Sequence, residues 1–162
     1  WLNLPAHEKM SQPTYHSIKK EEIPEVSFDA GKIRVLAASY KDIQGYKGEH
    51  WPIDYYDIHF DQEGSLELST EMDDFVMIFT LLGDVIVGDT LIEEKTAVRL
   101  TPGTSIHLKS HHTPSQVLFI RSKPLKEPIA WAGPIVMNTQ KELEQAFTDL
   151  QTGQFIKEKA QY

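Results

Sequence analysis

The sequence has 162 residues, enough for one domain with a full hydrophobic core or for one domain and an arm. Its hydrophobic content of 40% and charged content of 25% are ordinary for a soluble globular domain. A net charge of −8 argues against a nucleic-acid surface, and the absence of cysteine excludes disulfides, thiol nucleophiles and cysteine-based zinc sites.

The first 24 residues predict an extended arm. Three prolines (Pro5, Pro13 and Pro24) and mostly polar side chains disfavour a helix here. The chain opens on Trp1 rather than Met, and an exposed Trp with two Leu would be unusual at a natural N-terminus. We therefore expect a piece cut from a longer protein.

Short segments with strand character follow at even spacing. They are rich in apolar and β-branched residues, several alternate apolar with polar side chains, and turn residues separate them. The run from Phe75 to Val87 is interrupted only by Gly83-Asp84, which predicts two strands joined by a tight turn. Many short strands indicate an all-β sandwich or barrel rather than a parallel sheet. The predicted strand regions are Ile33–Tyr40, Tyr56–Phe60, Leu66–Leu68, Phe75–Val87, Thr96–Leu100, Ser105–Leu108 and Gln116–Ile120.

One segment near the C-terminus has helical spacing instead. Thr139 followed by Glu142 is the pattern of a capping box, and Gly153 is a typical helix end. Apolar residues recur between them at Leu143, Ala146, Phe147 and Leu150. We expect an arm over residues 1–24, a β-barrel over 25–138, and an amphipathic helix with its tail over 139–162, packed on the barrel.

The stretch from Gly64 to Ser110 resembles the two short motifs of the cupin superfamily. The first motif is Gly, five residues, His-x-His, three or four residues, Glu, six residues and Gly. The second is Pro-x-Gly-x-x-His, three residues and Asn. On this spacing Gly83 closes the first motif, Gly103 anchors the second, and the metal-ligand positions fall on Thr70, Met72, Val76 and Ile106. The resemblance implies a jelly-roll β-barrel.

None of these four positions carries a metal ligand of the motif. Residues 70 and 72 would lie two apart on one strand and face the same side, but they present a hydroxyl and a thioether. Val76 and Ile106 offer no donor to Fe(II), Mn(II) or Ni(II). We expect ordinary core at Met72, Val76 and Ile106, or a pocket for an apolar ligand, and no metal in this barrel.

Both ends of the chain resemble the C-terminal half of pirin-family proteins. The similarity at the start runs from Leu2 to Met10 and continues through Pro13, Tyr15 and Glu22-Ile23-Pro24. At the other end it covers Glu127-Pro128-Ile129, the string Gly133–Thr139, and Gln145-Ala146 and Asp149 of the predicted helix. Gly83-Asp84-Val85 with Gly88 resembles the central hairpin of that family.

The pirin resemblance implies two cupin barrels in tandem. In that family the metal, usually iron, lies in the N-terminal barrel on three histidines and a glutamate, which would precede Trp1 here. We therefore expect no cofactor in this chain and a structural or regulatory role beside an absent iron-binding N-terminal cupin domain. The alternatives are part of a metal-dependent quercetin 2,3-dioxygenase and a binding module like a redox-responsive transcription cofactor, with a further protein partner.

The predicted setting follows from composition. The lack of cysteine fits a cytoplasmic protein. No apolar run approaches the roughly 20 residues that cross a bilayer. We expect contact with neither a membrane nor, directly, a nucleic acid.

The remaining polar residues predict no catalytic site. His107 lies one residue past a ligand position and should point outward. The adjacent His111 and His112 should diverge into solvent, and His59 should lie on the surface or rim beside Asp57. Glu71 should point outward, and pairs such as Asp73-Asp74 are most simply solvated charges. His50-Trp51-Pro52 predicts a mobile loop, and no Gly-x-Ser-x-Gly elbow supports nucleophilic catalysis.

Overall fold

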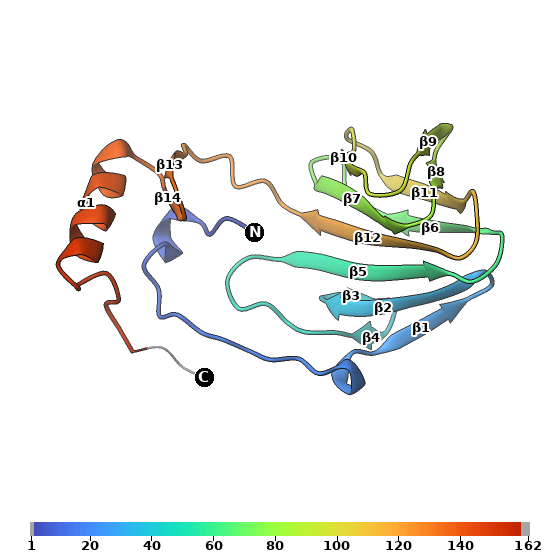
Figure 1. The fold of residues 1–162 in the computed structure, drawn as a ribbon, viewed down its shortest axis with the longest axis horizontal. Coiled ribbons are helices and arrows are strands. Elements are labelled where there is room, and N and C mark those ends of the chain that lie inside the picture. The colour runs from blue at the N-terminus through green and yellow to red at the C-terminus, as the bar shows by residue number, and fades with distance from the viewer. Residues whose placement is uncertain (1, 160–162) are drawn as a thin grey trace. The chain divides into compact units, whose positions relative to one another are not determined.

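Strands dominate the regular structure of residues 2–159, which are the residues that the computed structural model describes (Figure 1). The expectation for Trp1 therefore lies outside the described residues. The chain forms two compact units. One comprises Lys19–Pro124, and the other joins Trp1–Ile18 to Leu125–Tyr162.

The unit Lys19–Pro124 contains two antiparallel sheets (Figure 1). The larger has six strands in the order β1 (Glu25–Phe28), β2 (Gly31–Ala37), β5 (Ile53–Phe60), β12 (Ser115–Ser122), β7 (Phe75–Leu82) and β10 (Ala97–Arg99). The smaller has four, in the order β6 (Ser65–Ser69), β11 (Ser105–Ser110), β8 (Val85–Val87) and β9 (Thr90–Ile92). A two-stranded hairpin of β3 (Ser39–Tyr40) and β4 (Ile43–Gln44) and a short 3-10 helix at Lys20–Glu22 complete the unit.

The two sheets share one apolar core, because alternate residues of both contribute to the same buried cluster. Tyr56 and Phe119 stack within it, with ring centroids 5.4 Å apart. Hydrogen bonds between the described strands leave the sheets separate, so the expected barrel is an open double sheet. The buried inward residues include Ile33, Val35, Ile58, Phe60, Leu66, Leu68, Val76, Ile78, Val85, Ile106, Leu108 and Val117.

The two strands predicted on either side of the turn at Gly83-Asp84 are confirmed, but they do not pair with each other. β7 and β8 both form, but β7 belongs to the six-stranded sheet and β8 to the four-stranded one. Gly83 has a φ of +64°, and a Cβ there would lie 2.9 Å from the Pro114 carbonyl oxygen, so the turn requires glycine. The turn thus passes the chain from one sheet to the other. The paired hairpin is that of β8 and β9, next to Gly88.

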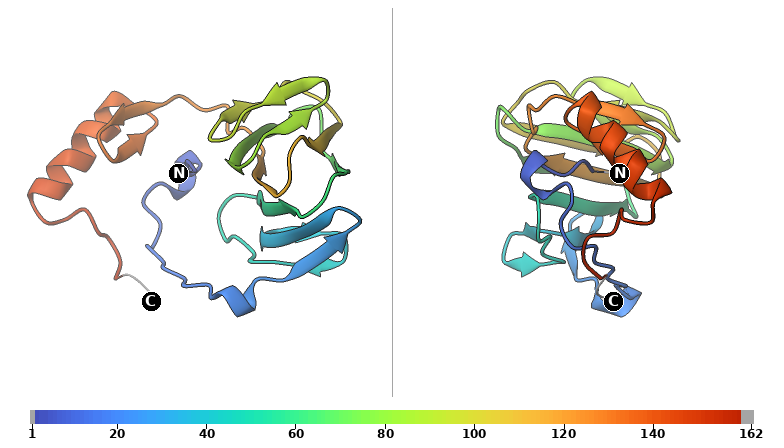
Figure 2. Two further views of the ribbon diagram at one scale, coloured as in Figure 1. Left: turned by 45° about the vertical axis from the view of Figure 1, so that its right-hand side comes forward. Right: turned by 90° about the vertical axis from the view of Figure 1, so that its left-hand side faces the viewer.

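The second unit is built on one helix and one hairpin. The helix α1 (Gln140–Gln151) lies beside the strands β13 (Ala130–Ala132) and β14 (Ile135–Met137), as Figure 2 shows. Its buried residues Leu143 and Ala146 pack with Ile135. Sequence patterns missed the two short strands, and the packing of this helix on the barrel stays a prediction. Among the described residues no helix is long and apolar enough to cross a membrane.

The predicted helix ends are confirmed. The Thr139 hydroxyl accepts a hydrogen bond from the Glu142 N–H at 3.2 Å, and the Glu142 carboxylate accepts one from the Thr139 N–H at 2.8 Å. This reciprocal arrangement is the capping box expected from the sequence. Gly153, with a φ of +72°, follows the last turn.

A carboxylate joins the N-terminal arm to the C-terminal segment. The arm forms a 3-10 turn at Ala6–Glu8, preceded by the fully buried Pro5. Glu127 Oε2 accepts hydrogen bonds from the Ala6 N–H at 2.9 Å and from Asn138 Nδ2 at 3.0 Å. The two strings that carry the pirin resemblance are therefore hydrogen-bonded to each other.

The contacts of Glu127 predict that Glu127→Ala will loosen the arm. The substitution removes a charged acceptor from two donors, and we expect a loss of about 1–2 kcal/mol in the stability of this unit. Limited proteolysis should then cut residues 2–18 faster than in the unaltered chain. Glu144→Ala is the matched control, because Gln140 alone among the described residues donates a hydrogen bond to this exposed carboxylate. Equal cleavage of both variants would contradict the role of Glu127.

Candidate functional site

The two cupin-like motifs meet at one end of the shared core. Thr70 follows the last residue of β6, and its hydroxyl donates to the Gly103 carbonyl oxygen at 2.7 Å. Its N–H donates to the Thr104 carbonyl oxygen at 2.9 Å. Gly103, which anchors the second motif, thus contacts Thr70, which stands at the first ligand position of the first motif.

Val76 and Ile106 are core residues, as predicted. They are 6% and 4% exposed and belong to the cluster shared by the two sheets. Val76 comes from β7 and Ile106 from β11, so the two ligand positions approach the core from opposite sheets. Leu66 and Leu68 are the inward residues of β6, and Thr70 continues their alternation.

Met72 is not core, and this prediction is wrong. Its side chain is 59% exposed. The strand ends at Ser69, and a turn follows in which the Asp74 N–H donates to the Glu71 carbonyl oxygen at 3.0 Å. Residues 70 and 72 therefore do not share a strand face. The turn forms because the chain has to leave the four-stranded sheet before it enters β7 of the other.

The residues at the ligand positions do not fit an iron site of three histidines and a glutamate. Thr70 donates its hydroxyl hydrogen to a carbonyl, and Val76 and Ile106 have no donor atom. Fe(II), Mn(II) and Ni(II) require imidazole or carboxylate ligands, and none stands at these positions.

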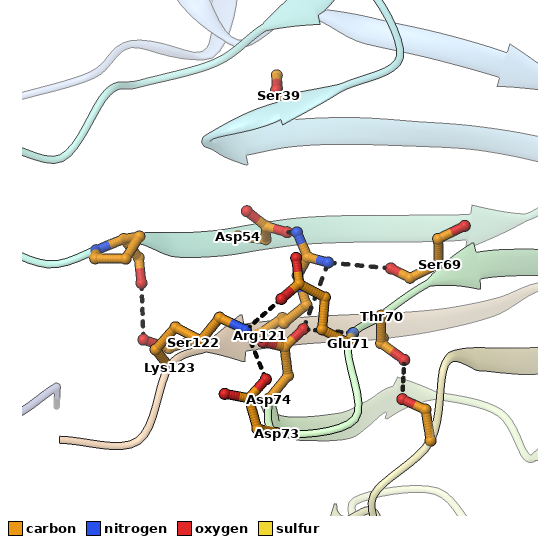
Figure 3. A network of polar contacts seen from close by, with 12 residues as sticks. Ser39, Asp54, Ser69, Thr70, Glu71, Asp73, Asp74, Arg121, Ser122 and Lys123 are labelled. Carbon is orange, nitrogen blue, oxygen red and sulfur yellow. Dashed lines mark hydrogen bonds and ion pairs between the residues drawn. The ribbon is translucent and has the colours of Figure 1, made fainter. Parts of the chain in front are cut away.

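Charged residues occupy this end of the core instead (Figure 3). On β12 the inward residues Val117 and Phe119 are followed, two positions on, by Arg121. On β5 the inward Tyr56 is preceded, two positions back, by Asp54. Arg121 and Asp54 are direct partners in the ladder between these strands and form an ion pair.

Arg121 reaches from one sheet to the other. Its Nη1 donates to the Ser69 carbonyl oxygen at 3.2 Å and lies 3.6 Å from Asp74 Oδ2. Ser69 is the last residue of β6, and Asp74 lies just before β7. Figure 3 shows the guanidinium between Asp54 and the turn at residues 70–74. These contacts of Arg121 link the two sheets at the charged end of the core.

Asp74 is not a solvated charge, which corrects the expectation for Asp73-Asp74. Its side chain is only 4% exposed and lies 2.8 Å from Lys123 Nζ. The same ammonium lies 2.6 Å from Glu71 and 2.9 Å from Asp73. These three carboxylates have oxygen atoms within 4.8 Å of one another, a spacing that could hold a metal ion, and the ammonium of Lys123 contacts all three.

The environment shifts the acid–base properties of this cluster. Burial raises the pKa of Asp54 above its ordinary value, against the opposing effect of Arg121. Burial alone would also raise the pKa of Asp74, but hydrogen bonds from Lys123 and from the Glu71 N–H, with the charge of Arg121, hold it below its ordinary value. Burial and the neighbouring Asp54 raise the pKa of Tyr56, whose hydroxyl donates to the Ser39 carbonyl oxygen at 2.5 Å.

A polar pocket of about 420 Å³ lies beside the same end of β5. Asp54 lines it together with Ser39, His50 and Trp51. The predicted loop at His50-Trp51-Pro52 is anchored, because Trp51 Nε1 donates to the Lys123 carbonyl oxygen at 2.8 Å. Lys123 therefore binds this loop through its backbone and the acidic turn through its side chain.

The other histidines lie in separate places. His107 is exposed, as predicted. His111 and His112 are exposed but do not diverge, since their ring centroids are 4.3 Å apart. His59 is half-buried, with Nε2 3.0 Å from Asp57 Oδ2.

Asp57 is a buried carboxylate that the sequence patterns did not single out. It is 4% exposed and accepts hydrogen bonds from Arg34 at 3.1 Å and from Gln116 at 2.7 Å. Its strand neighbours Tyr56 and Ile58 point into the core. The cluster around Asp57 therefore covers the outer face of the six-stranded sheet and is separate from the charged end of the core.

Comparison with known proteins agrees with this architecture. The Pirin C-terminal cupin domain family matches residues 55–156. The chain belongs to this family. The pirin relatives include the putative quercetin 2,3-dioxygenase Ta0133 of Thermoplasma acidophilum, 38% identical over 97% of this chain and 64% of its own length. Human pirin is 32% identical over 92% of this chain and 53% of its own.

A solved pirin-like structure extends the agreement to three dimensions. Quercetin 2,3-dioxygenase from Acinetobacter baumannii superposes with a TM-score of 0.87 at 31% identity, covering 96% of this chain and 55% of that one. The all-β, jelly-roll-like cupin fold is thus confirmed. The chain spans about half to two thirds of the length of these relatives.

The burial of Asp74 predicts an acid-sensitive contribution to stability. Asp74→Asn should lower the free energy of unfolding by about 2 kcal/mol at neutral pH, because the partly exposed Lys123 and Arg121 lose a charged partner. The pKa of Asp74 is depressed by folding, so this contribution is fully present above the unfolded value of about 3.9 and is lost as the pH falls through the lower folded value. The difference between the two proteins should therefore shrink below pH of about 4.

Denaturant unfolding at several pH values measures this difference. Asp73→Asn is the matched control, since Asp73 contacts the same ammonium but is 62% exposed, and we expect less than about 1 kcal/mol for it. Equal losses of unfolding free energy for Asp74→Asn and Asp73→Asn would contradict the role assigned to Asp74. A loss for Asp74→Asn that grows in acid would also contradict it.

Proposed function

We propose that this chain is a metal-free C-terminal cupin domain that serves as the structural and regulatory partner of an iron-binding N-terminal cupin domain in a pirin-like protein. The observation that carries the proposal is the chemistry of the ligand positions. Val76 and Ile106 are buried aliphatic residues, Thr70 is bonded to a carbonyl, and Met72 lies outside the core. A double sheet with this interior offers no metal ligands at the cupin positions, and this favours a supporting role beside another domain.

An exposed apolar surface supports the partner role. Ile129 and Trp131 are each 69% exposed, and with Val136 and Asn3 they line a mostly apolar pocket of about 290 Å³ on the second unit. An aromatic and an aliphatic side chain side by side in solvent are typical of a surface that another protein covers. The relatives are longer than this chain, and we assign this surface to the other cupin domain of the longer protein.

Metal analysis tests the metal-free assignment. The chain, purified from cells grown with added iron, should contain iron well below one atom per chain. The longer protein, prepared in parallel, should retain iron, and this preparation is the control for loss during purification. Iron held at one atom per chain in the short chain would overturn the assignment.

The exposed apolar surface predicts a selective effect of Trp131→Ser. The longer protein should lose about 2 kcal/mol or more, as for a buried aromatic contact at an interface. The short chain should keep its own thermal midpoint, because Trp131 is exposed there. Ile156→Ser is the control, since Ile156 is 65% exposed in the same unit but does not line the pocket. Equal effects of both substitutions on the longer protein would contradict the docking assignment.

The alternative is that the longer protein is a quercetin 2,3-dioxygenase to which this chain contributes no metal ligand. The names of the relatives from Thermoplasma acidophilum and Acinetobacter baumannii favour it. Oxygen uptake with quercetin separates the two roles. The longer protein should consume oxygen if it is a dioxygenase, whereas the short chain should not, and turnover by the short chain would refute its non-catalytic role.

A further inference from the structure

We propose that Arg121 is the resident cation of this domain, and that its guanidinium occupies the end of the core where a ligand-bearing cupin holds its metal ion. The proposal rests on the metal-free role given above and supplies its physical cause. Loss of the ligands would leave a pocket that could be filled by apolar residues or by water. In this chain a fixed positive charge fills it.

Strand register places Arg121 beside one of the degenerate ligand positions, Val76. Arg121 is the direct partner of Val76 in the ladder between β12 and β7, and of Asp54 in the ladder between β12 and β5. Partners in an antiparallel ladder have side chains on the same face, with Cβ atoms about 5 Å apart. The base of the Arg121 side chain is therefore next to the glutamate position of the cupin motif.

The head group reaches the residue that precedes a second ligand position. Nη1 donates to the carbonyl oxygen of Ser69, the residue before Thr70, at 3.2 Å. Arg121 thus bridges from the strand beside Val76 to the strand that leads into Thr70. One side chain spans the gap between the two sheets that a metal and its ligands would span.

The guanidinium also has the surroundings of a bound cation. Asp54 and Asp74 lie on either side of it, with side chains 15% and 4% exposed, while that of Arg121 is 29% exposed. A divalent ion at this place would meet a positive charge that is already paired, and the repulsion is strong where water is scarce. Arg121 therefore both neutralises the two carboxylates and excludes a metal.

Substitution of Arg121 by methionine tests the proposal in the chain as it stands. Arg121→Met keeps an unbranched apolar side chain but leaves Asp54 and Asp74 without the guanidinium. We expect the unfolding equilibrium constant to rise at least about 100-fold, as for a broken buried pair. Oxygen ligands suit Mn²⁺, so millimolar MnCl₂ should raise the thermal midpoint of Arg121→Met and leave that of the unaltered chain unchanged.

Two further variants supply the controls. Arg99→Met removes an exposed arginine on β10 that lies over the Phe75 ring, and it should show neither the large loss nor the response to Mn²⁺. Arg121→Lys keeps the charge without the planar head group. It should be more stable than Arg121→Met and indifferent to Mn²⁺. If Arg121→Met folds only when Mn²⁺ is present, that result also supports the proposal.

The outcomes separate this inference from the metal-free role. The resident-cation proposal is overturned if Arg121→Met is as stable as Arg99→Met, or if it is destabilised but does not respond to Mn²⁺. In either case the iron content of the unaltered chain still decides the metal-free role. A response to Mn²⁺ by Arg121→Lys equal to that of Arg121→Met also overturns the resident-cation proposal. Iron bound by the unaltered chain refutes the metal-free role on its own, whatever the variants do.

Discussion

The two sheets of Lys19–Pro124 share a single apolar core, and this sharing constrains nearly every strand of the unit. A strand that faces a common core has one side for apolar groups and the other for polar ones. A polar group that falls on the inner side must find a partner there, because burial without one is unfavourable. Thr80 satisfies this condition by donating to the Glu93 carbonyl oxygen at 2.6 Å. Asp54 and Arg121 satisfy it by pairing with each other.

The same alternation explains what the sequence could predict. Strand regions such as Tyr56–Phe60 and Ser105–Leu108 were recognisable because alternate residues are apolar. The sheet to which each strand belongs was not recognisable, because Gly83-Asp84 indicates a bend and not the partner of the strand that follows. The capping box at Thr139 was predictable because both of its partners lie within one helical turn. The hairpin of β13 and β14 was too short to give a periodic signal.

The candidate site was predictable only in part. Motif spacing correctly assigned Val76 and Ile106 to the core. It failed at Met72, because the template assumes that a strand continues where this chain turns. It also missed the charged residues, which at strand ends resemble solvated groups. Alternation could have found Arg121, because it stands two residues after Phe119 and four after Val117, on the same face of β12.

The two strings that carry the pirin resemblance have a local structural explanation in the second unit. Ala6 from one string and Asn138 from the other both donate to Glu127. Pro5 is buried beside the start of the turn at Ala6–Glu8, and Thr139 begins the helix. These strings therefore identify the family through residues that fold the chain termini together.

The pairing of Arg121 with Val76 in the ladder affects how a metal site could be introduced into this domain. A histidine regained at position 70 or 106 would enter a core that already contains a paired guanidinium, so a single ligand would bring strain without metal affinity. Loss of Arg121 alone would remove the guanidinium partner of Asp54 and leave Asp74 with Lys123 as its one remaining cation among the described residues. A site of the histidine type would need several substitutions at once, whereas the single change Arg121→Met is expected to admit Mn²⁺ only on carboxylate oxygen atoms. On the proposal made above, the guanidinium of Arg121 is the group that any metal would have to displace from this end of the core.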